Sequence, residues 1–115
     1  MYMPNGDKAI VDDAKITDYL LNLRHPDGGP KAKFFFNKGY TLDAPEILKR
    51  ALVEHAKFCQ VTKVERTKFG TKYIIEGAIV TPKEPEVQVA YIRTVWMEAA
   101  GSNQPKLVTA YPYKP

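Results

Sequence analysis

Apolar positions in the first part of the chain recur with the spacing of a helix. Over residues 13–22 they follow one another at intervals of three and four, which places them on one face of an amphipathic helix. This apolar stripe consists of Ile16, Tyr19, Leu20 and Leu23. Either Asp12 or Asp13 is a suitable N-cap for such a helix. Residues 8–11, before it, are predicted to form a short strand or an extended arm.

Two further helices are predicted before the pattern changes. Residues 31–38 form the first, which ends where Gly39 takes the C′ position. Its three consecutive phenylalanines cannot all face one way, so this helix is expected to be covered on two sides. Residues 43–46 resemble a capping box with a proline in the first turn, and they predict a helix that runs to about Phe58. Its predicted buried stripe consists of Ile47, Leu48, Ala51, Leu52, His55 and Phe58.

After Phe58 the period changes from helical to alternating, which is typical of strands. The predicted strands span residues 60–66, 72–80, 87–97 and 107–111, with a hairpin turn at 68–70. Helices followed by an antiparallel sheet predict an α+β fold. We therefore expect one domain over 1–115, with two to three helices packed on a four-stranded antiparallel sheet. Its parts are an N-terminal arm or strand (1–12), a helical part (13–58) and the sheet (60–112).

Composition narrows the class of protein. A chain of 115 residues with 44% hydrophobic and 26% charged residues can build a single hydrophobic core. It contains no run of eighteen apolar residues, and its first residues lack the apolar segment of a signal peptide, so a cytoplasmic location is expected. Cys59 is the one cysteine, which excludes an internal disulfide and a cysteine-rich zinc site; we expect it to be a buried small hydrophobe.

Positive charge is concentrated in the middle of the chain. The net charge is only +4, yet residues 31–72 hold ten basic side chains against four acidic ones. A local positive field fits a polyanionic partner such as a nucleic acid. Solvated helix and strand surfaces would give the same count, so charge alone does not decide between the two.

The loop at residues 24–30 contains the first candidate for chemistry. His25 precedes a proline, which favours an extended backbone there, and two glycines follow. An imidazole can exchange a proton near neutral pH, so His25 is a candidate acid or base. The structural alternative is a loop histidine that hydrogen-bonds the end of a helix.

Two lysines follow this loop. Lys31 and Lys33 diverge by roughly 200° on a helix, so they cannot both face one ligand. Lys31 lies in the first turn, where free backbone amides also favour an anion, and it is the better phosphate ligand. Lys33 is the weaker candidate, and either lysine could be an ordinary exposed side chain.

The sheet offers the second group of candidates. Arg93, in the middle of a strand, must lie on an open face or meet an anion, because burying it unpaired is costly. A concave sheet could present Tyr73, Arg93, Thr109 and Tyr111 to a nucleotide beside the His25 loop. The structural alternative is that the tyrosines belong to the core. Because His55 lies on the predicted apolar stripe, we interpret it as a packed structural histidine.

Other chemistries find no support in the sequence. With two histidines and no cluster of metal-binding residues, a transition-metal site is not expected. No glycine-rich phosphate loop followed by Lys-Ser or Lys-Thr is present, so hydrolysis of nucleoside triphosphates is not expected either. No cofactor is predicted.

Spaced motifs over most of the chain resemble a known group of proteins. The motifs are residues 17–22 (TDYLLN), His25-Pro26, Gly28-Gly29, residues 31–35 (KAKFF), residues 70–73 (GTKY), Trp96 and residues 107–112 (LVTAYP). They resemble the toxin domains at the C-termini of bacterial contact-dependent inhibition proteins, and also stand-alone cytoplasmic relatives of toxin–antitoxin type. That group has the ribonuclease fold shared by barnase, EndoU, colicin nucleases and RelE, with the active site on the open face of the sheet.

The resemblance implies metal-independent cleavage of RNA, and of tRNA in particular. The ribose 2′-OH would attack the adjacent phosphate and leave a 2′,3′-cyclic phosphate, with a small antidote or immunity protein as partner. His25 would be the general acid or base, Lys31 and Arg93 would stabilise the transition state, and Thr109 would position the phosphate. The substrate-binding residues would be Lys33, Tyr73, Trp96 and Tyr111, with Tyr73 or Trp96 stacking a base or supporting the sheet.

Two alternatives remain open at this point. A non-catalytic module of a phage or defence system could use the same basic face to hold RNA or a protein. A structural phage or defence component could keep the fold without the activity. Cleavage of RNA would separate the enzyme from both alternatives.

Overall fold

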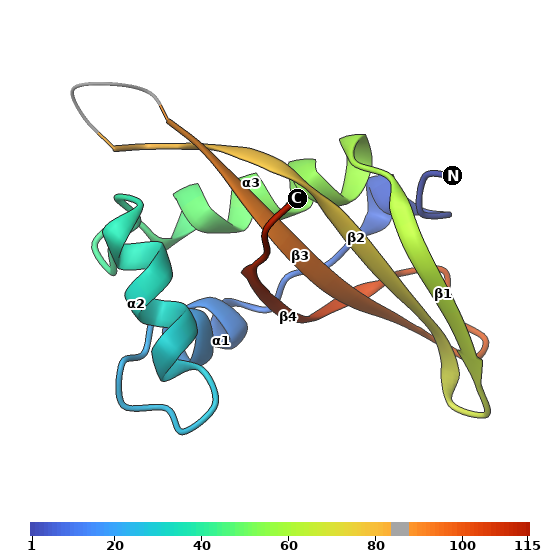
Figure 1. Ribbon diagram of the computed structural model, residues 1–115. Coiled ribbons are helices and arrows are strands. Elements are labelled where there is room, and N and C mark those ends of the chain that lie inside the picture. Colours follow the sequence, from blue (N-terminus) through green and yellow to red (C-terminus); the bar gives the residue numbers. More distant parts are fainter. Residues whose placement is uncertain (84–87) are drawn as a thin grey trace.

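The computed structural model describes residues 1–83 and 88–115. The helices are η1 (Gly6–Lys8), α1 (Asp13–Lys15), η2 (Ile16–Leu20), α2 (Gly29–Asn37) and α3 (Pro45–Phe58). The strands are β1 (Val61–Thr67), β2 (Gly70–Thr81), β3 (Gln88–Ala99) and β4 (Lys106–Pro112). Figure 1 shows their arrangement along the chain.

The four strands form one antiparallel sheet in the order β1-β2-β3-β4. Neighbouring strands are consecutive in the sequence, so each short connection is a turn or loop (Figure 1). The strands predicted from alternating apolar positions are confirmed, with boundaries that differ by one or two residues. The start of the third predicted strand, at residue 87, lies outside the described residues.

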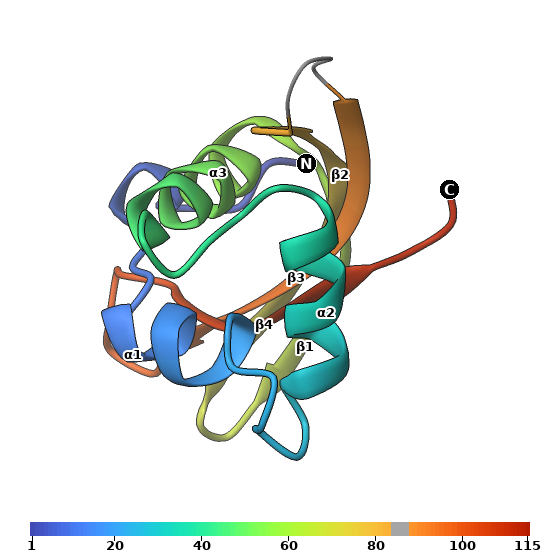
Figure 2. The same cartoon turned by 90° about the vertical axis from the view of Figure 1, so that its left-hand side faces the viewer.

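The helices pack on one face of the sheet and leave the other face open, which confirms the α+β prediction. Helices α1 and α3 lie on the same side of the sheet (Figure 2), and α3 contacts β2. The largest side chains of this core are Trp96, Tyr40, Phe35, Ile16, Leu20, Leu21, Leu48, Leu52, Ile75 and Ile92. Alternation along the strands sends the intervening side chains to the open face.

The first predicted helix is different from the regular α-helix that its pattern indicated. After α1 the chain forms the π-helix η2, in which the backbone N–H of Leu21 donates to the carbonyl of Ile16 over 2.8 Å. This wider turn brings Leu21 into the core and ends the helix, so Leu23, predicted on the buried stripe, is 61% exposed. Asp12 is the N-cap of α1, but its side chain makes no capping hydrogen bond.

Helices α2 and α3 are confirmed with three corrections. Helix α2 begins at Gly29, earlier than predicted, and Gly39 after its end has a positive φ of 99°, as a C′ glycine requires. The prediction of a capping box was wrong, because the N-cap of α3 is Ala44 and no side chain caps the helix. The predicted stripe of α3 is buried only in its middle, since Ile47 and Phe58 are exposed.

The N-terminal segment contains the short helix η1 and then reaches the edge of the sheet at Ile10. Ile10 makes a single parallel bridge with Lys106, in which its N–H donates to the carbonyl of Pro105 over 2.8 Å. The side chains of Met3 and Val11 are buried, so the segment contributes to the core. Among the described residues, no helix is both long and apolar enough to cross a membrane.

Candidate active site

Three polar groups from distant parts of the chain meet beside β4. The ammonium of Lys31, on α2, donates to Tyr19 Oη of η2 and to Thr109 Oγ1 of β4, the second bond measuring 3.0 Å. Tyr19 Oη and Thr109 Oγ1 are themselves 2.8 Å apart, and either can be the donor. We refer to these three residues as the Lys–Tyr–Thr cluster. It holds one positive charge and two hydroxyls that can each accept or donate.

Two glycines let the start of α2 pack closely on η2 and on the segment that follows it. A Cβ atom on Gly28 would come within 2.3 Å of the carbonyl oxygen of Tyr19, and one on Gly29 within 2.7 Å of the carbonyl oxygen of Leu23. Only glycine fits such an approach. The loop therefore packs directly on η2, and Lys31 in the first turn of α2 reaches Tyr19.

A β-bulge sets the position of Thr109. Val95 pairs with Thr109, whereas the next residue, Trp96, pairs with Leu107, so Val108 is the extra residue in β4. A bulge re-aims the side chains next to it. Here Val108 and Thr109 both face the groove beside α2.

His25 points its ring at Tyr19 and binds the start of α2. Its Nδ1 atom accepts the backbone N–H of Asp27 over 3.0 Å and that of Gly28 over 2.9 Å. Its ring lies edge-on to the ring of Tyr19, with centroids 4.9 Å apart. A nitrogen that accepts two N–H groups carries no proton, so the neutral ring has its hydrogen on Nε2.

The cluster and His25 line one surface groove. Its lining residues are Lys15, Tyr19, His25, Pro26, Asp27, Lys31, Val108 and Thr109. The structure thus brings together three residues that the sequence suggested as catalytic: His25, Lys31 and, from the other end of the chain, Thr109. A second ammonium, that of Lys15, lies 5.2 Å from the centroid of the Tyr19 ring. Two lysines against one aspartate make the groove suitable for an anion.

Arg93 belongs to a row of residues on the open face. Glu76, Arg93 and Tyr111 lie directly opposite one another on β2, β3 and β4. Both Nε and Nη2 of Arg93 lie 3.1 Å from Glu76 Oε1, and both side chains are about one-third exposed or less. The Arg93 guanidinium lies 5.6 Å from the Tyr111 ring centroid and 5.4 Å from that of Tyr113. Burial raises the pKa of Tyr113, and the nearby carboxylate of Glu76 raises it further, so the phenol is kept neutral.

The row adjoins the groove through one aromatic ring. Lys31 Nζ lies 5.8 Å from the centroid of Tyr111, on whose ring Arg93 also lies. Tyr111 is half-buried and therefore offers part of its ring to a ligand. Positive charge thus extends from the groove across the open face of the sheet.

Three of the candidate residues lie away from the groove. Lys33 is exposed on another side of α2, as the helical spacing predicted. Tyr73 and Trp96 pair across β2 and β3 on the core face, where they are 7% and 0% exposed. Neither ring offers a face to a ligand, and each supports the sheet instead.

His55 is a packed structural histidine, as predicted. It is 2% exposed, with Nδ1 3.1 Å from Thr94 Oγ1 and Nε2 3.3 Å from the carbonyl oxygen of Gly77. Trp96 Nε1 donates to the same Thr94 hydroxyl over 2.8 Å. Burial lowers the pKa of His55 to about 4, so the ring is neutral at physiological pH. Cys59, expected to be buried, is only partly so, and it packs at the edge of this core.

Sequence analysis did not single out two residues of these sites. Tyr19 belongs to the apolar stripe of its helix, where a tyrosine is usually a core residue. Its polar hydroxyl was the one indication in the sequence that it could take part in a site. Glu76 faces Arg93 across the predicted hairpin. A search for opposite charges at paired strand positions would have found it.

The fold is that of an α+β protein with helices on one face of a four-stranded antiparallel sheet, and a groove lined by two lysines lies between a helix and the last strand. The chain belongs to the family described as "Domain of unknown function (DUF6883)", whose model matches residues 2–114. No curated protein matches the chain.

Among solved structures, the fold is similar to a chain of a contact-dependent growth inhibition toxin–immunity protein complex from Klebsiella pneumoniae 342. The TM-score is 0.71, with 98% of this chain and 100% of that chain covered, and the sequences are 15% identical. At this identity the likeness establishes a shared fold and leaves the chemistry to the site itself.

Proposed function

We propose that this protein is a metal-independent endoribonuclease toxin that cuts RNA, with tRNA as its target, and is neutralised by an antidote protein. The observation that carries the proposal is the meeting of Lys31, Tyr19, Thr109 and His25 in one cationic groove. Such a groove suits a phosphodiester, because its donors converge where negative charge develops in the transition state.

Lys31 and Thr109 bind the phosphate. The ammonium and the hydroxyl are 3.0 Å apart, so one nonbridging oxygen can accept from both. His25 adds a third donor, because its Nε2 carries the hydrogen while Nδ1 accepts two backbone N–H groups. Protonating Nδ1 would break these two bonds, which argues for a hydrogen-bonding role in place of the acid or base role predicted for His25.

Proton transfer is the role of Tyr19. The 2′-oxygen forms a bond to phosphorus, the bond from phosphorus to the 5′-oxygen breaks, and Tyr19 gives its proton to that 5′-oxygen. The 2′-hydroxyl proton leaves to water, which afterwards reprotonates the tyrosinate. Lys31, hydrogen-bonded to Tyr19 Oη, stabilises the negative charge that the tyrosine gains. The products are a 2′,3′-cyclic phosphate and a 5′-OH.

Arg93 and Tyr111 extend the site to the neighbouring nucleotide. Lys33, on another side of α2, does not reach the groove. Because Arg93 is paired with Glu76, its charge acts on the substrate less strongly than that of Lys31. A small immunity protein as partner is supported by the toxin–immunity complex whose chain has a similar fold.

Incubation of the purified chain with total tRNA and EDTA tests this function. We expect discrete fragments whose 3′ ends carry a cyclic phosphate and whose 5′ ends are hydroxyls. Binding of tRNA without fragments would favour the non-catalytic module. Fragments that disappear on adding EDTA would contradict a metal-independent reaction.

A further inference from the structure

The open face of the sheet holds a carboxylate with one oxygen available to a ligand. Arg93 Nε and Nη2 both lie 3.1 Å from Glu76 Oε1. Thr62 Oγ1 lies 3.3 Å from the same atom and 3.4 Å from the carbonyl oxygen of Ile74, and its one hydrogen is shared between the two acceptors. Glu76 Oε2 has no hydrogen-bond partner among the described residues. The two N–H groups of Arg93 hold the carboxylate in one orientation and leave Oε2 as an acceptor.

Aromatic rings flank this carboxylate. The Arg93 guanidinium lies within 6 Å of the Tyr111 and Tyr113 ring centroids, and Tyr113 packs edge-on against Tyr91 with centroids 6.3 Å apart. A shallow groove on this face is lined by Thr62, Lys63, Ile74, Glu76, Arg93 and Tyr111. Half-exposed tyrosine rings and a guanidinium plane are the surfaces on which unpaired bases stack.

Tyr111, which lines this second groove, lies close to Lys31 of the first. Tyr111 lies between Lys31 and Arg93, with the ammonium 5.8 Å and the guanidinium 5.6 Å from its ring centroid. A nucleotide whose phosphate is bound at Lys31 therefore has its base, or that of its neighbour, within reach of Tyr111 and Glu76.

We propose that Glu76, Tyr111 and Tyr113 form a nucleobase subsite that selects bases carrying an exocyclic amino group over uracil. The inference rests on the proposed function, because it places the base of the same RNA whose phosphate binds in the groove.

The selectivity follows from the chemistry of the carboxylate. An ionised carboxylate only accepts hydrogen bonds, so Oε2 pairs with the amino group of guanine, adenine or cytosine. Uracil presents one N–H between two carbonyl oxygens, and these oxygens would meet the negative charge of Glu76. The two N–H groups of Arg93 that face Glu76, on Nε and Nη2, are directed at Oε1 and leave Oε2 to the base.

Binding of the four nucleoside 3′-monophosphates by the full chain tests the subsite without requiring cleavage. We expect the adenosine, cytidine and guanosine compounds to bind at least about tenfold more tightly than the uridine compound. Glu76→Gln, whose amide both donates and accepts, should reduce this difference to about threefold or less. Tyr113→Leu should weaken all four by removing a stacking surface.

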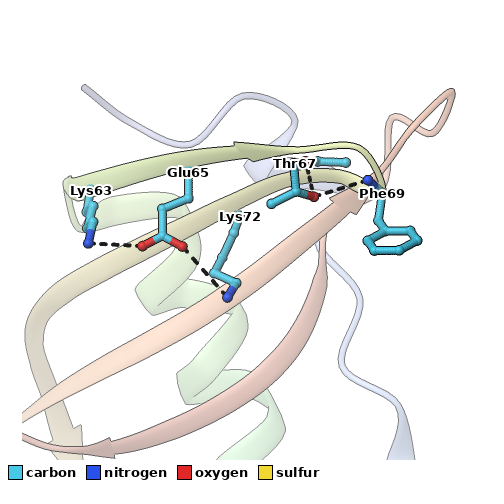
Figure 3. Close-up of polar contacts among 6 residues, drawn as sticks. Lys63, Glu65, Thr67, Phe69 and Lys72 are labelled. Carbon is cyan, nitrogen blue, oxygen red and sulfur yellow. Dashed lines mark hydrogen bonds and ion pairs between the residues drawn. The ribbon is translucent and has the colours of Figure 1, made fainter.

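Glu65→Gln is the matched control. Glu65 lies on the same face, where it pairs with Lys63 over 2.9 Å and Lys72 over 3.8 Å (Figure 3), so the variant loses the same charge at another place. It should keep the preference for amino-bearing bases. Lys31→Met should weaken all four compounds by a similar factor and leave their order unchanged.

The outcomes separate this subsite from the ribonuclease activity. Equal binding of uridine by the native chain, or an unchanged preference in Glu76→Gln, overturns the subsite even if tRNA is cut. A preference that depends on Glu76 in a protein that leaves tRNA intact supports the subsite and overturns the nuclease. Absence of any nucleotide binding overturns the subsite.

Discussion

Two clusters in this protein use the same kinds of residue for opposite purposes. In the core, His55, Thr94 and Trp96 form a buried chain in which every polar side-chain atom has a partner. In the groove, Tyr19, Lys31 and Thr109, with His25 beside them, are half-buried and carry a positive charge that no carboxylate within the cluster neutralises.

The direction of hydrogen bonding explains the difference. Trp96 donates to Thr94, Thr94 to His55 Nδ1, and His55 Nε2 to the carbonyl of Gly77, so the chain of donors ends within the protein. In the groove the donors of Lys31 exceed the two acceptors that it contacts. A saturated chain stabilises the fold, whereas an excess of donors is available to a substrate.

Lys31→Met should cause the largest loss, because it removes the only charge of the Lys–Tyr–Thr cluster. We expect RNA cleavage to fall about 100- to 1,000-fold, while the free energy of unfolding changes by less than about 1 kcal/mol. Rates of tRNA cleavage and urea denaturation provide both numbers. Lys33→Met, two residues along the same helix and exposed, is the control and should cut normally. Equal losses in the two variants would contradict the special role of Lys31.

The two threonines give a paired comparison of the clusters. Thr94→Val should destabilise the fold by about 3 kcal/mol, because it leaves the Trp96 N–H and His55 Nδ1 unpaired in the core. Thr109→Val should cost less than about 1 kcal/mol, because its site is half-exposed, and should slow cleavage about 10- to 100-fold. Denaturant unfolding and cleavage rates check both variants. A larger loss of stability in Thr109→Val than in Thr94→Val, with normal cleavage by Thr109→Val, would contradict the roles assigned to the two clusters.

The buried histidine predicts a dependence of stability on pH. Burial lowers the pKa of His55 from 6.5 to about 4, so between these values the unfolded chain binds the proton more readily than the folded one. The stabilisation is therefore complete above pH 6.5 and is lost as the pH falls towards 4. Because one pKa unit corresponds to about 1.4 kcal/mol, the total loss is about 3 kcal/mol.

Urea denaturation at several pH values, with NMR titration of the two histidine rings, measures this effect. A His55 ring that titrates near pH 6.5 in the folded protein would contradict the assignment of the core chain.

The smallest effect is expected at the start of α2. His25→Ala should cost about 1 kcal/mol, the usual value of a helix cap, because the N–H groups of Asp27 and Gly28 lose their acceptor. His25→Asn, whose carbonyl can accept, should restore most of this stability without restoring the donor that faces the groove. Thermal unfolding of both variants provides the measurement, and an unchanged midpoint in His25→Ala would argue against the capping bonds.

Local pattern was enough to predict the sheet, but not which side chains meet in the site. Alternation along β3 places Ile92, Thr94 and Trp96 on one face, but the pattern alone does not tell that this face is the buried one. The role of Tyr19 was not predicted, because its hydroxyl bonds to Thr109, ninety positions away, and local spacing does not encode such a contact.

The groove also depends on irregular features that leave weak traces in a sequence. The π-helix η2 and the bulge at Val108 each shift one residue relative to a regular element, and together they turn Tyr19 and Thr109 towards Lys31. The glycine pair at 28–29 is visible in the sequence. The close approach of Gly28 to Tyr19 and of Gly29 to Leu23 explains why that loop needs two glycines.

The proton transfer assigned to Tyr19 is the central claim, and a change of leaving group tests it most directly. Tyr19→Phe should cut ordinary RNA about 100-fold more slowly or worse than the native chain. On a substrate whose scissile 5′-oxygen is replaced by sulfur, which leaves without a proton, the same variant should be nearly as fast as the native chain. An equal defect on both substrates, or no cleavage of either by the native chain, would contradict the claim.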